Sequence, residues 1–405
     1  MKLRLKINKI KNILIYFFLF LAAMNFQAKF FYFVFIVFFL IVLQRRIKLS
    51  AMSVVYLALC ILMAFYNYKE GLMSILRCLS PLFFYLVGLN IVKNSDGRAL
   101  HRYGIYTAEM DCYLVLVMIS FGSFTHFILN YFYNFGKFLG RNTNDIWTGE
   151  VMAATGQCAL ACMMIGLSVS MLFAPIKKWH RLVACASIVF MMLYILVLAT
   201  RTPIVIFLLS LLIGLVYCVI NSRNVTKKVR SILFFSIFLV VILLSYMMNV
   251  GGIQDFVKSS AIYERFAGSW STITENSSRN DAKLSFLMDG INYPFGGLNM
   301  RRKYGYAHDL LLDGYDEYGF LALILMIVIL VAGIVQLYKV LRCDTISKEL
   351  KLTLLLIYVA VLLEFTVEPI LEGMSWLFSC YCLINGCMSS LNWSCYRQGK
   401  RSKPA

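Results

Sequence analysis

Residues 318–338 read YGFLALILMIVILVAGIVQLY, a run without a charged side chain. An α-helix rises 1.5 Å per residue, so about 20 residues span the roughly 30 Å hydrocarbon core of a bilayer. An uncharged apolar run of this length therefore predicts a transmembrane helix.

Comparable apolar runs recur along the chain. Of its 405 residues, 60% are apolar and 15% charged, whereas soluble domains have roughly 45–50% and 25%. The pattern predicts an all-α, polytopic membrane helix bundle with about twelve transmembrane helices and one long extracytoplasmic loop. We expect the helices at residues 12–26, 29–43, 51–66, 72–92, 112–133, 151–174, 183–199, 203–220, 232–249, 318–338, 352–368 and 374–391. The first two are short, but basic clusters on both sides of the pair favour a hairpin over one long helix.

The basic residues orient this bundle. With the N-terminus inside, the cytoplasmic segments carry 26 Lys and Arg residues, and the five short outer loops carry five. This asymmetry follows the positive-inside rule and places both chain ends in the cytoplasm. Five basic residues precede the first apolar run, as in a signal peptide. A second apolar run follows at once, which favours an uncleaved anchor.

This topology divides the chain into four parts. Residues 1–249 form a nine-helix membrane region, and residues 250–317 form the long extracytoplasmic loop that carries the catalytic residues. Residues 318–391 form three further helices, and residues 392–405 form a cytoplasmic tail. A loop as long as 250–317 between membrane helices is usually functional.

Charge and cysteine content exclude two other classes of protein. The net charge of +19 comes from basic residues spaced between apolar runs, which is not typical of a nucleic-acid-binding domain. Most of the 12 cysteines lie in apolar runs and none lies in the long outer loop. We therefore expect no disulfide framework and no metal site.

Two arginines of the membrane region are expected near the outer face. Arg77 lies in the first turns of helix 72–92, and Arg201 begins the turn Thr200-Arg201-Thr202-Pro203. A charged residue at membrane depth is costly and indicates a functional site. The alternative for both is an interfacial role, in which the side chain extends to the membrane surface.

The outer loop adds four arginines and a histidine, namely Arg265, Arg279, Arg301, Arg302 and His308. Guanidinium groups bind phosphate oxygens in a bidentate manner, and an imidazole that titrates near neutrality accepts a proton from a hydroxyl group. A structural role for the histidine is the alternative. The set suits a lipid-diphosphate donor and a sugar-hydroxyl acceptor, with arginine charge in place of a metal ion.

The pattern resembles the O-antigen polymerase and O-antigen ligase superfamily of bacterial envelope assembly. His308 and Asp309, then nine residues and Gly319, keep the spacing of a ligase-branch motif, although Asp309 and Ala322 depart from it. The Thr-Arg-Thr-Pro turn and the segment 277–297 also resemble segments of this superfamily. The likeness covers mainly residues 195–390.

The resemblance implies a metal-independent glycosyltransferase in the bacterial cytoplasmic membrane, without a cofactor. Its substrate would be an undecaprenyl-diphosphate-linked oligosaccharide, transferred to another lipid-linked repeat unit. Arg201 and Arg279 would hold the diphosphate, and His308 would activate the acceptor. From their placement we add Arg77, Arg265, Arg301 and Arg302 as diphosphate-binding residues. Glu317 is expected to cap helix 318–338 or to orient the histidine.

Three alternatives stay open at this point. The motif departures favour the polymerase branch over a ligase that transfers glycan to lipid A core. A lipid-linked oligosaccharide flippase would more often show internal repeats and charged residues deep in several helices. A structural or sensory protein would use the arginines only as interfacial anchors. A chain-length regulator, a flippase and membrane lipids are the partners that the polymerase assignment implies.

Overall fold

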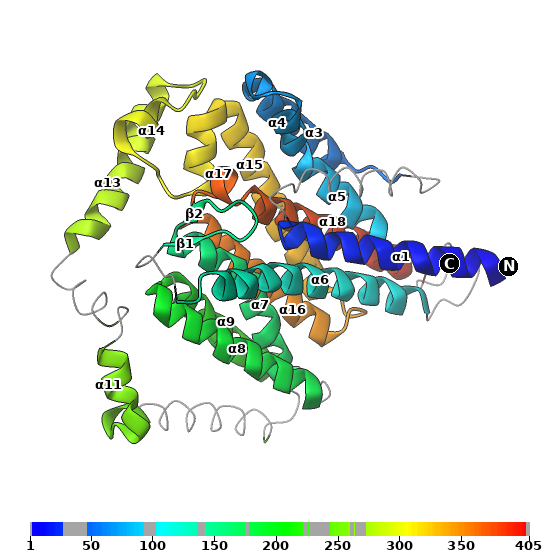
Figure 1. Ribbon diagram of the computed structural model, residues 1–405. Helices are drawn as coiled ribbons and strands as arrows, with labels where there is room; N and C mark the ends of the chain where they lie inside the picture. The colour runs from blue at the N-terminus through cyan, green and yellow to red at the C-terminus, as the bar shows by residue number, and fades with distance from the viewer. Residues whose placement is uncertain are drawn as a thin grey trace.

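The computed structural model describes residues 2–26, 47–92, 103–136, 142–174, 178–221, 226, 244–259, 263 and 273–401. These residues form helices and one two-stranded antiparallel sheet, in which Thr143 pairs with Met152 and Asn144 with Val151 (Figure 1). The predicted helices 29–43 and 232–249 fall largely outside the described residues, as does Arg265.

Helices follow one another along most of the described chain, and the two strands stand between α6 and α7. In chain order the elements are α1 Lys2–Ala23, α3 Ala51–Tyr66, η2 Tyr68–Glu70, α4 Leu72–Cys78, α5 Ser80–Ile91, α6 Tyr103–Tyr133, β1 Thr143–Asn144, β2 Val151–Met152, α7 Ala154–Phe173, α8 Lys178–Leu198, α9 Thr202–Asn221, η3 Val250–Gly252, α11 Ile253–Lys258, α13 Ile273–Asp289, η4 Gly290–Asn292, α14 Asn299–Tyr304, α15 Leu310–Arg342, α16 Lys348–Phe365, α17 Ile370–Gly373 and α18 Ser375–Arg401.

The prediction of an all-α membrane protein agrees with this architecture. Five described helices are long and apolar enough to cross a bilayer: the Ala108–Tyr133 part of α6, and α7, α8, α9 and α15. Shorter apolar helices occur at Ile13–Ala23, Ala51–Tyr66 and Ser80–Ile91. The count of twelve spans stays a prediction.

Two predicted helices have different boundaries in the structure. The prediction of a single helix at residues 72–92 is wrong, because the chain forms α4 and α5 with a break at Leu79. Pro81 stands in the first turn of α5, where its missing N–H costs nothing, and it cannot continue an earlier helix. Helix 318–338 begins earlier, at Leu310, and is kinked at Gly319. Part of the predicted loop 250–317 is therefore helical, in α11, α13, α14 and the start of α15.

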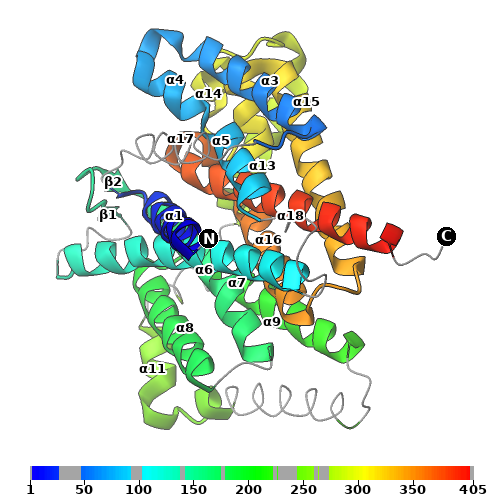
Figure 2. The same cartoon turned by 90° about the vertical axis from the view of Figure 1, so that its right-hand side faces the viewer.

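Hydrogen bonds between helix ends define two ends of the bundle. At the hairpin end, which carries β1 and β2, Trp147 Nε1 donates to the Met24 carbonyl beyond α1 over 3.2 Å. At the opposite end, the Ser347 N–H before α16 donates to Glu109 in α6 over 3.3 Å. We call this opposite end the terminal end, since α1 starts there and α18 ends there (Figures 1 and 2). The elements α13, α14 and α17 lie toward the hairpin end (Figure 1).

Glycines allow the central helices to approach closely. A Cβ on Gly88 of α5 would lie 2.1 Å from the Leu383 carbonyl oxygen of α18. A Cβ on Gly386 of α18 would lie 2.2 Å from the Tyr85 carbonyl oxygen. Small residues at such contacts let helix backbones pack against each other, which is a main source of association between helices in membranes. The α5–α18 pair thus forms a closely packed centre beside the site described below.

One pair of cysteines is linked in the structure. Cys343, after α15, and Cys395, in α18, form a disulfide with a Cα–Cα distance of 6.7 Å, whereas the sequence analysis expected no disulfide framework. The other ten cysteines form no disulfide. The pair meets because α15 packs against α18, a contact that spacing along the chain does not reveal. It lies at the terminal end, for which the sequence analysis predicts a cytoplasmic location, and disulfides are rare in the cytoplasm.

Candidate functional site

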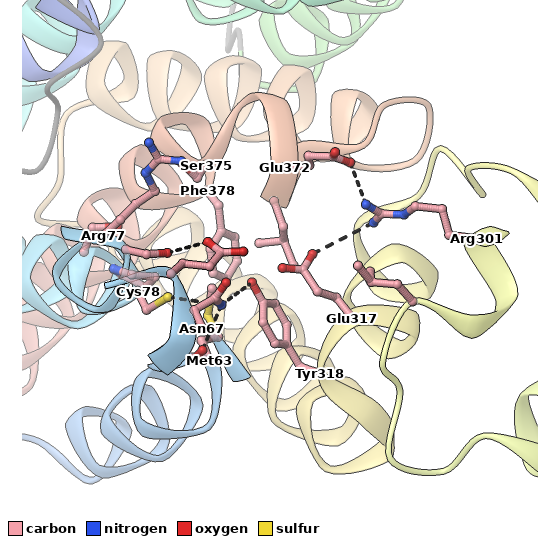
Figure 3. A pocket seen from close by; sticks show the side chains of 16 residues that line it. Met63, Asn67, Arg77, Cys78, Arg301, Glu317, Tyr318, Glu372, Ser375 and Phe378 are labelled. Atoms are coloured by element: carbon pink, nitrogen blue, oxygen red, sulfur yellow. Dashed lines mark hydrogen bonds and ion pairs between the residues drawn. The ribbon is translucent and has the colours of Figure 1, made fainter. Parts of the chain in front are cut away.

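A cavity of about 200 Å³, which we call the arginine cavity, opens among the ends of α3, α4, α14 and α17 (Figure 3). Arg77 and Arg301 line it on opposite sides, Glu317 and Glu372 lie between them, and Glu70 also lines it. The structure therefore brings two of the predicted diphosphate-binding arginines to one cavity. The three carboxylates were not predicted to share it.

Arg301 is the most highly connected charged side chain of this cavity. Its Nη1 lies 2.7 Å from Glu372 Oε2, its Nη2 lies 3.9 Å from Glu317 Oε2, and its Nε lies 3.9 Å from Asp316 Oδ2. Figure 3 shows the guanidinium held between the carboxylates of Glu317 and Glu372. An incoming phosphate oxygen must compete with these carboxylates for the same N–H donors.

Arg301 is also connected to His308 through an aromatic ring. The guanidinium lies 4.5 Å from the ring centroid of Tyr306, within the range of a cation–π contact. The Tyr306 and His308 ring centroids are 6.0 Å apart. The Tyr306 hydroxyl donates to Glu372 Oε1 over 2.9 Å, and burial together with this bond raises the pKa of Tyr306. The imidazole thus lies one aromatic ring away from the arginine cavity and does not line it.

The start of α15 changes the predicted role of Glu317. Asp309 is the N-cap, and its Oδ1 accepts from the N–H groups of Leu311 and Leu312 over 3.0 and 3.3 Å. The expectation that Glu317 caps the helix is therefore wrong, because the helix begins seven residues earlier, at Leu310. Glu317 instead faces the arginine cavity, where its carboxylate pairs with Arg301.

The kink at Gly319 fixes the wall of the arginine cavity. Gly319 has φ 80° and ψ −178°, a conformation that only glycine adopts readily. The turn predicted at residues 292–297 packs on this kink, where the Phe320 N–H donates to the Pro294 carbonyl over 2.8 Å. A Cβ on Gly319 would lie 2.8 Å from that same oxygen. The glycine of the His308–Gly319 spacing is therefore needed for backbone geometry.

A second cavity, of about 440 Å³, adjoins the first, and we call it the hairpin cavity. Arg77, Glu372 and Ser375 line both cavities. The rest of the hairpin cavity comes from the β1–β2 hairpin, the start of α7 and the α16–α18 connection, and includes Asp145, Thr148, Glu150, Thr155, Glu368 and Trp376. It carries four carboxylates and one guanidinium.

Three buried polar side chains, two in the last turns of α6 and one just beyond its end, hold the hairpin in place. His126, Asn130 and Asn134 are spaced four residues apart and so lie on one helix face. His126 Nε2 donates to Asp145 over 2.7 Å, Asn130 accepts from the Ile146 N–H, and Asn134 donates to the Asn144 carbonyl. Sequence analysis missed this set, although its spacing within an apolar helix was a usable signal.

Asp145 is the charged residue that this anchoring positions most firmly. Burial raises the pKa of its carboxyl, but the hydrogen bonds from His126 and from the backbone N–H groups of Thr148 and Trp147 outweigh burial. The pKa of Asp145 therefore lies below its usual value. Asp145 is an anionic hydrogen-bond acceptor on the wall of the hairpin cavity.

Arg201 and Arg302 line neither cavity. Arg201 stands before α9, where its carbonyl accepts from the N–H groups of Ile204 and Val205. Arg302 is exposed on α14. Arg279 was expected near a helix start, but it lies inside α13, which begins at Ile273. The arrangement thus retains Arg77 and Arg301 from the predicted arginines and places His308 next to them.

Comparisons with models of known protein families and with curated proteins find no match to this chain.

Proposed function

We propose that the protein is a glycan polymerase that transfers a polyprenyl-diphosphate-linked oligosaccharide to a hydroxyl of another lipid-linked repeat unit. The observation that supports the proposal most directly is that Arg77 and Arg301 line one cavity and that His308 lies beside it. Two guanidiniums match the charge of a diphosphate leaving group. The reaction belongs at the outer face of the bacterial cytoplasmic membrane.

In this proposal each group has a defined task. Arg77 and Arg301 bind the donor diphosphate and stabilise the negative charge that develops as the glycosidic C–O bond breaks. His308 accepts the proton of the attacking hydroxyl, which requires movement toward the arginine cavity or a bridging water molecule. Arg201, Arg265 and Arg279 stay predicted phosphate contacts, whereas Arg302 is exposed, lines neither cavity and has no task in this scheme.

The test is a transfer assay with purified protein and a polyprenyl-diphosphate-linked repeat unit. We expect His308→Gln to lower turnover by about 10²–10⁴-fold, the usual contribution of a general base, with donor binding nearly unchanged. Arg301→Lys should restore little of the activity that Arg301→Ala loses, because an ammonium lacks the bidentate geometry. The matched control is Arg302→Lys, an exposed arginine of the same helix. Near-normal turnover in His308→Gln would remove the histidine from the mechanism.

Orientation in the membrane is tested separately. Reporter fusions at positions 180 and 345 should report the cytoplasm, and fusions at 140 and 280 should report the outside, because Lys and Arg are concentrated in the former set of segments. An outside signal at 180 or 345 would place the arginine cavity on the cytoplasmic face. The proposed transfer takes place on the outer face, so that result would contradict the proposal.

A lipid-linked oligosaccharide flippase is the second candidate. Glu364 in α16 is 1% exposed, and neither of its carboxylate oxygens has a hydrogen-bond partner in the described part of the chain. An ionisable residue buried in a membrane helix is a common feature of transport pathways. The test follows a labelled lipid-linked oligosaccharide in vesicles that contain the protein. Flipping by the wild-type protein, its loss in Glu364→Gln, and the absence of glycan transfer by the wild-type protein would together favour this candidate.

A further inference from the structure

The two cavities differ in volume and in charge. The arginine cavity, about 200 Å³, is smaller than a typical small-molecule pocket of roughly 300–1,000 Å³, whereas the hairpin cavity, about 440 Å³, falls within that range. The arginine cavity has two guanidiniums and three carboxylates, and the hairpin cavity has one guanidinium and four carboxylates. The excess of carboxylates therefore disfavours an anion in the hairpin cavity. Its volume accommodates a larger ligand than the arginine cavity does.

The hairpin cavity offers mainly hydrogen-bond acceptors. Asp145 and Glu150 contribute carboxylates from the turn between β1 and β2, Glu368 contributes one from the segment between α16 and α17, and Thr148 and Thr155 add hydroxyl groups. Among the residues that the structure describes, no three His, Cys, Asp or Glu side chains are grouped as a metal site requires. Carboxylates that are spread over a wall suit a ligand with several separate donors, such as the hydroxyl groups of a sugar.

The Asp145 carboxylate is held in place before any ligand arrives. Asp145 is 4% exposed, and its carboxylate is fixed by His126 and by two backbone N–H groups of the hairpin turn. Glu368 is 2% exposed. Such fixed groups lower the entropic cost of ligand binding, because they lose little freedom on contact.

We propose that the hairpin cavity is the acceptor-sugar site, in which Asp145, Glu150, Thr148 and Thr155 bind the hydroxyl groups of an uncharged glycan. This inference rests on the proposed function and adds the position of the acceptor. The wall that both cavities share, formed by Arg77, Glu372 and Ser375, is then where the attacking hydroxyl meets the donor's anomeric carbon. The new C–O bond forms there as the anomeric C–O bond to the diphosphate breaks. The hydroxyl proton passes to His308, through its movement or a bridging water molecule, and the diphosphate leaves on the side of Arg301.

The test measures binding and not turnover, so that it does not depend on the transfer reaction. The probe is the oligosaccharide released by mild acid from the lipid-linked repeat units of the source cells, titrated into the full-length protein in lipid nanodiscs. A short-chain polyprenyl diphosphate is titrated in parallel. Ala153→Trp places a large side chain in the hairpin cavity from an exposed position, and Glu150→Gln removes one exposed acceptor charge. The matched control is Asp344→Asn, an exposed carboxylate between α15 and α16.

We expect Ala153→Trp to abolish oligosaccharide binding and Glu150→Gln to weaken it about tenfold, as expected for loss of a hydrogen bond to a charged group. Diphosphate binding should be unchanged in both, and Asp344→Asn should bind both probes normally. Normal oligosaccharide binding by Ala153→Trp overturns the acceptor site, as does parallel loss of diphosphate binding or failure of the wild-type protein to bind the oligosaccharide. Glycan transfer by the wild-type protein in any of these cases leaves the proposed function standing.

Discussion

Glu372→Gln tests how strongly the carboxylates of the arginine cavity oppose diphosphate binding. Arg301 Nη1 lies 2.7 Å from Glu372 Oε2, and the two side chains are 14% and 47% exposed. Fully exposed ion pairs contribute roughly 0–1 kcal/mol, and removal of one partner of a buried pair costs about 3–5 kcal/mol. For this partly exposed pair we take about 1 kcal/mol, at the upper end of the exposed range.

A diphosphate that displaces Glu372 from Arg301 must overcome that interaction. Its removal in Glu372→Gln should strengthen binding of a short-chain polyprenyl diphosphate about fivefold, since 1.4 kcal/mol corresponds to a factor of ten. The amide still accepts the hydrogen bond from Tyr306, so the local packing is retained. Isothermal titration calorimetry on the purified protein measures the change.

Two further variants make the result decisive. Arg301→Ala should weaken diphosphate binding, and the double variant Arg301→Ala/Glu372→Gln should gain little from the second substitution, because the competing pair no longer exists. Unchanged or weaker binding by Glu372→Gln would refute the competition. Normal binding by Arg301→Ala would show that Arg301 does not contact the diphosphate.

Further predictions concern backbone geometry, pH, helix packing and metal dependence. Gly319→Ala should lower thermal stability and activity together, because φ 80° is strained for alanine by about 1–3 kcal/mol and the new Cβ would meet the Pro294 carbonyl; retained activity would contradict this. Asp145→Asn should lower the melting temperature at pH 7. The gap in melting temperature between wild type and variant should close as pH falls through the lowered pKa of Asp145, because the ionised carboxylate stabilises the fold and the protonated one does not. A gap that does not change with pH would exclude this linkage. Gly88→Leu should prevent accumulation of folded protein, measured by fluorescence-detected gel filtration, and a normal monodisperse peak would argue against close α5–α18 packing. Transfer activity should survive a chelator, and its recovery only with added magnesium or manganese would replace arginine charge by a metal ion in the leaving-group chemistry.

Much of the fold was predictable because the signal for a membrane helix is local in the sequence. The apolar runs at 183–199 and 203–220 correspond to α8 and α9 within a few residues, since apolar length alone decides whether a segment can span a bilayer. The break between α4 and α5 was readable from Pro81, but residues 72–92 are mostly apolar and have the length of one membrane helix, which concealed it. The helical start of α15 was missed because its first residues include several polar ones, of which Glu317 faces the arginine cavity.

The site was predictable in part. Chemistry and expected topology selected Arg77, Arg301 and His308, which lie near one another. The same reasoning selected Arg201 and Arg302 equally, and these do not line the cavities. Placement at one face of a membrane restricts residues to a plane, and within that plane only helix packing decides which of them meet.

The sequence by itself determined the class of protein, the helical segments and the asymmetric distribution of basic residues, because each depends on composition over a short stretch of chain. Only the tertiary structure decided that Glu372, between α16 and α18, pairs with Arg301, and that His126 in α6 fixes Asp145. Such contacts join segments that are distant in the sequence. The close approach of α5 and α18 at Gly88 and Gly386 and the backbone kink at Gly319 are likewise decided by partners that are known only once the helices are packed.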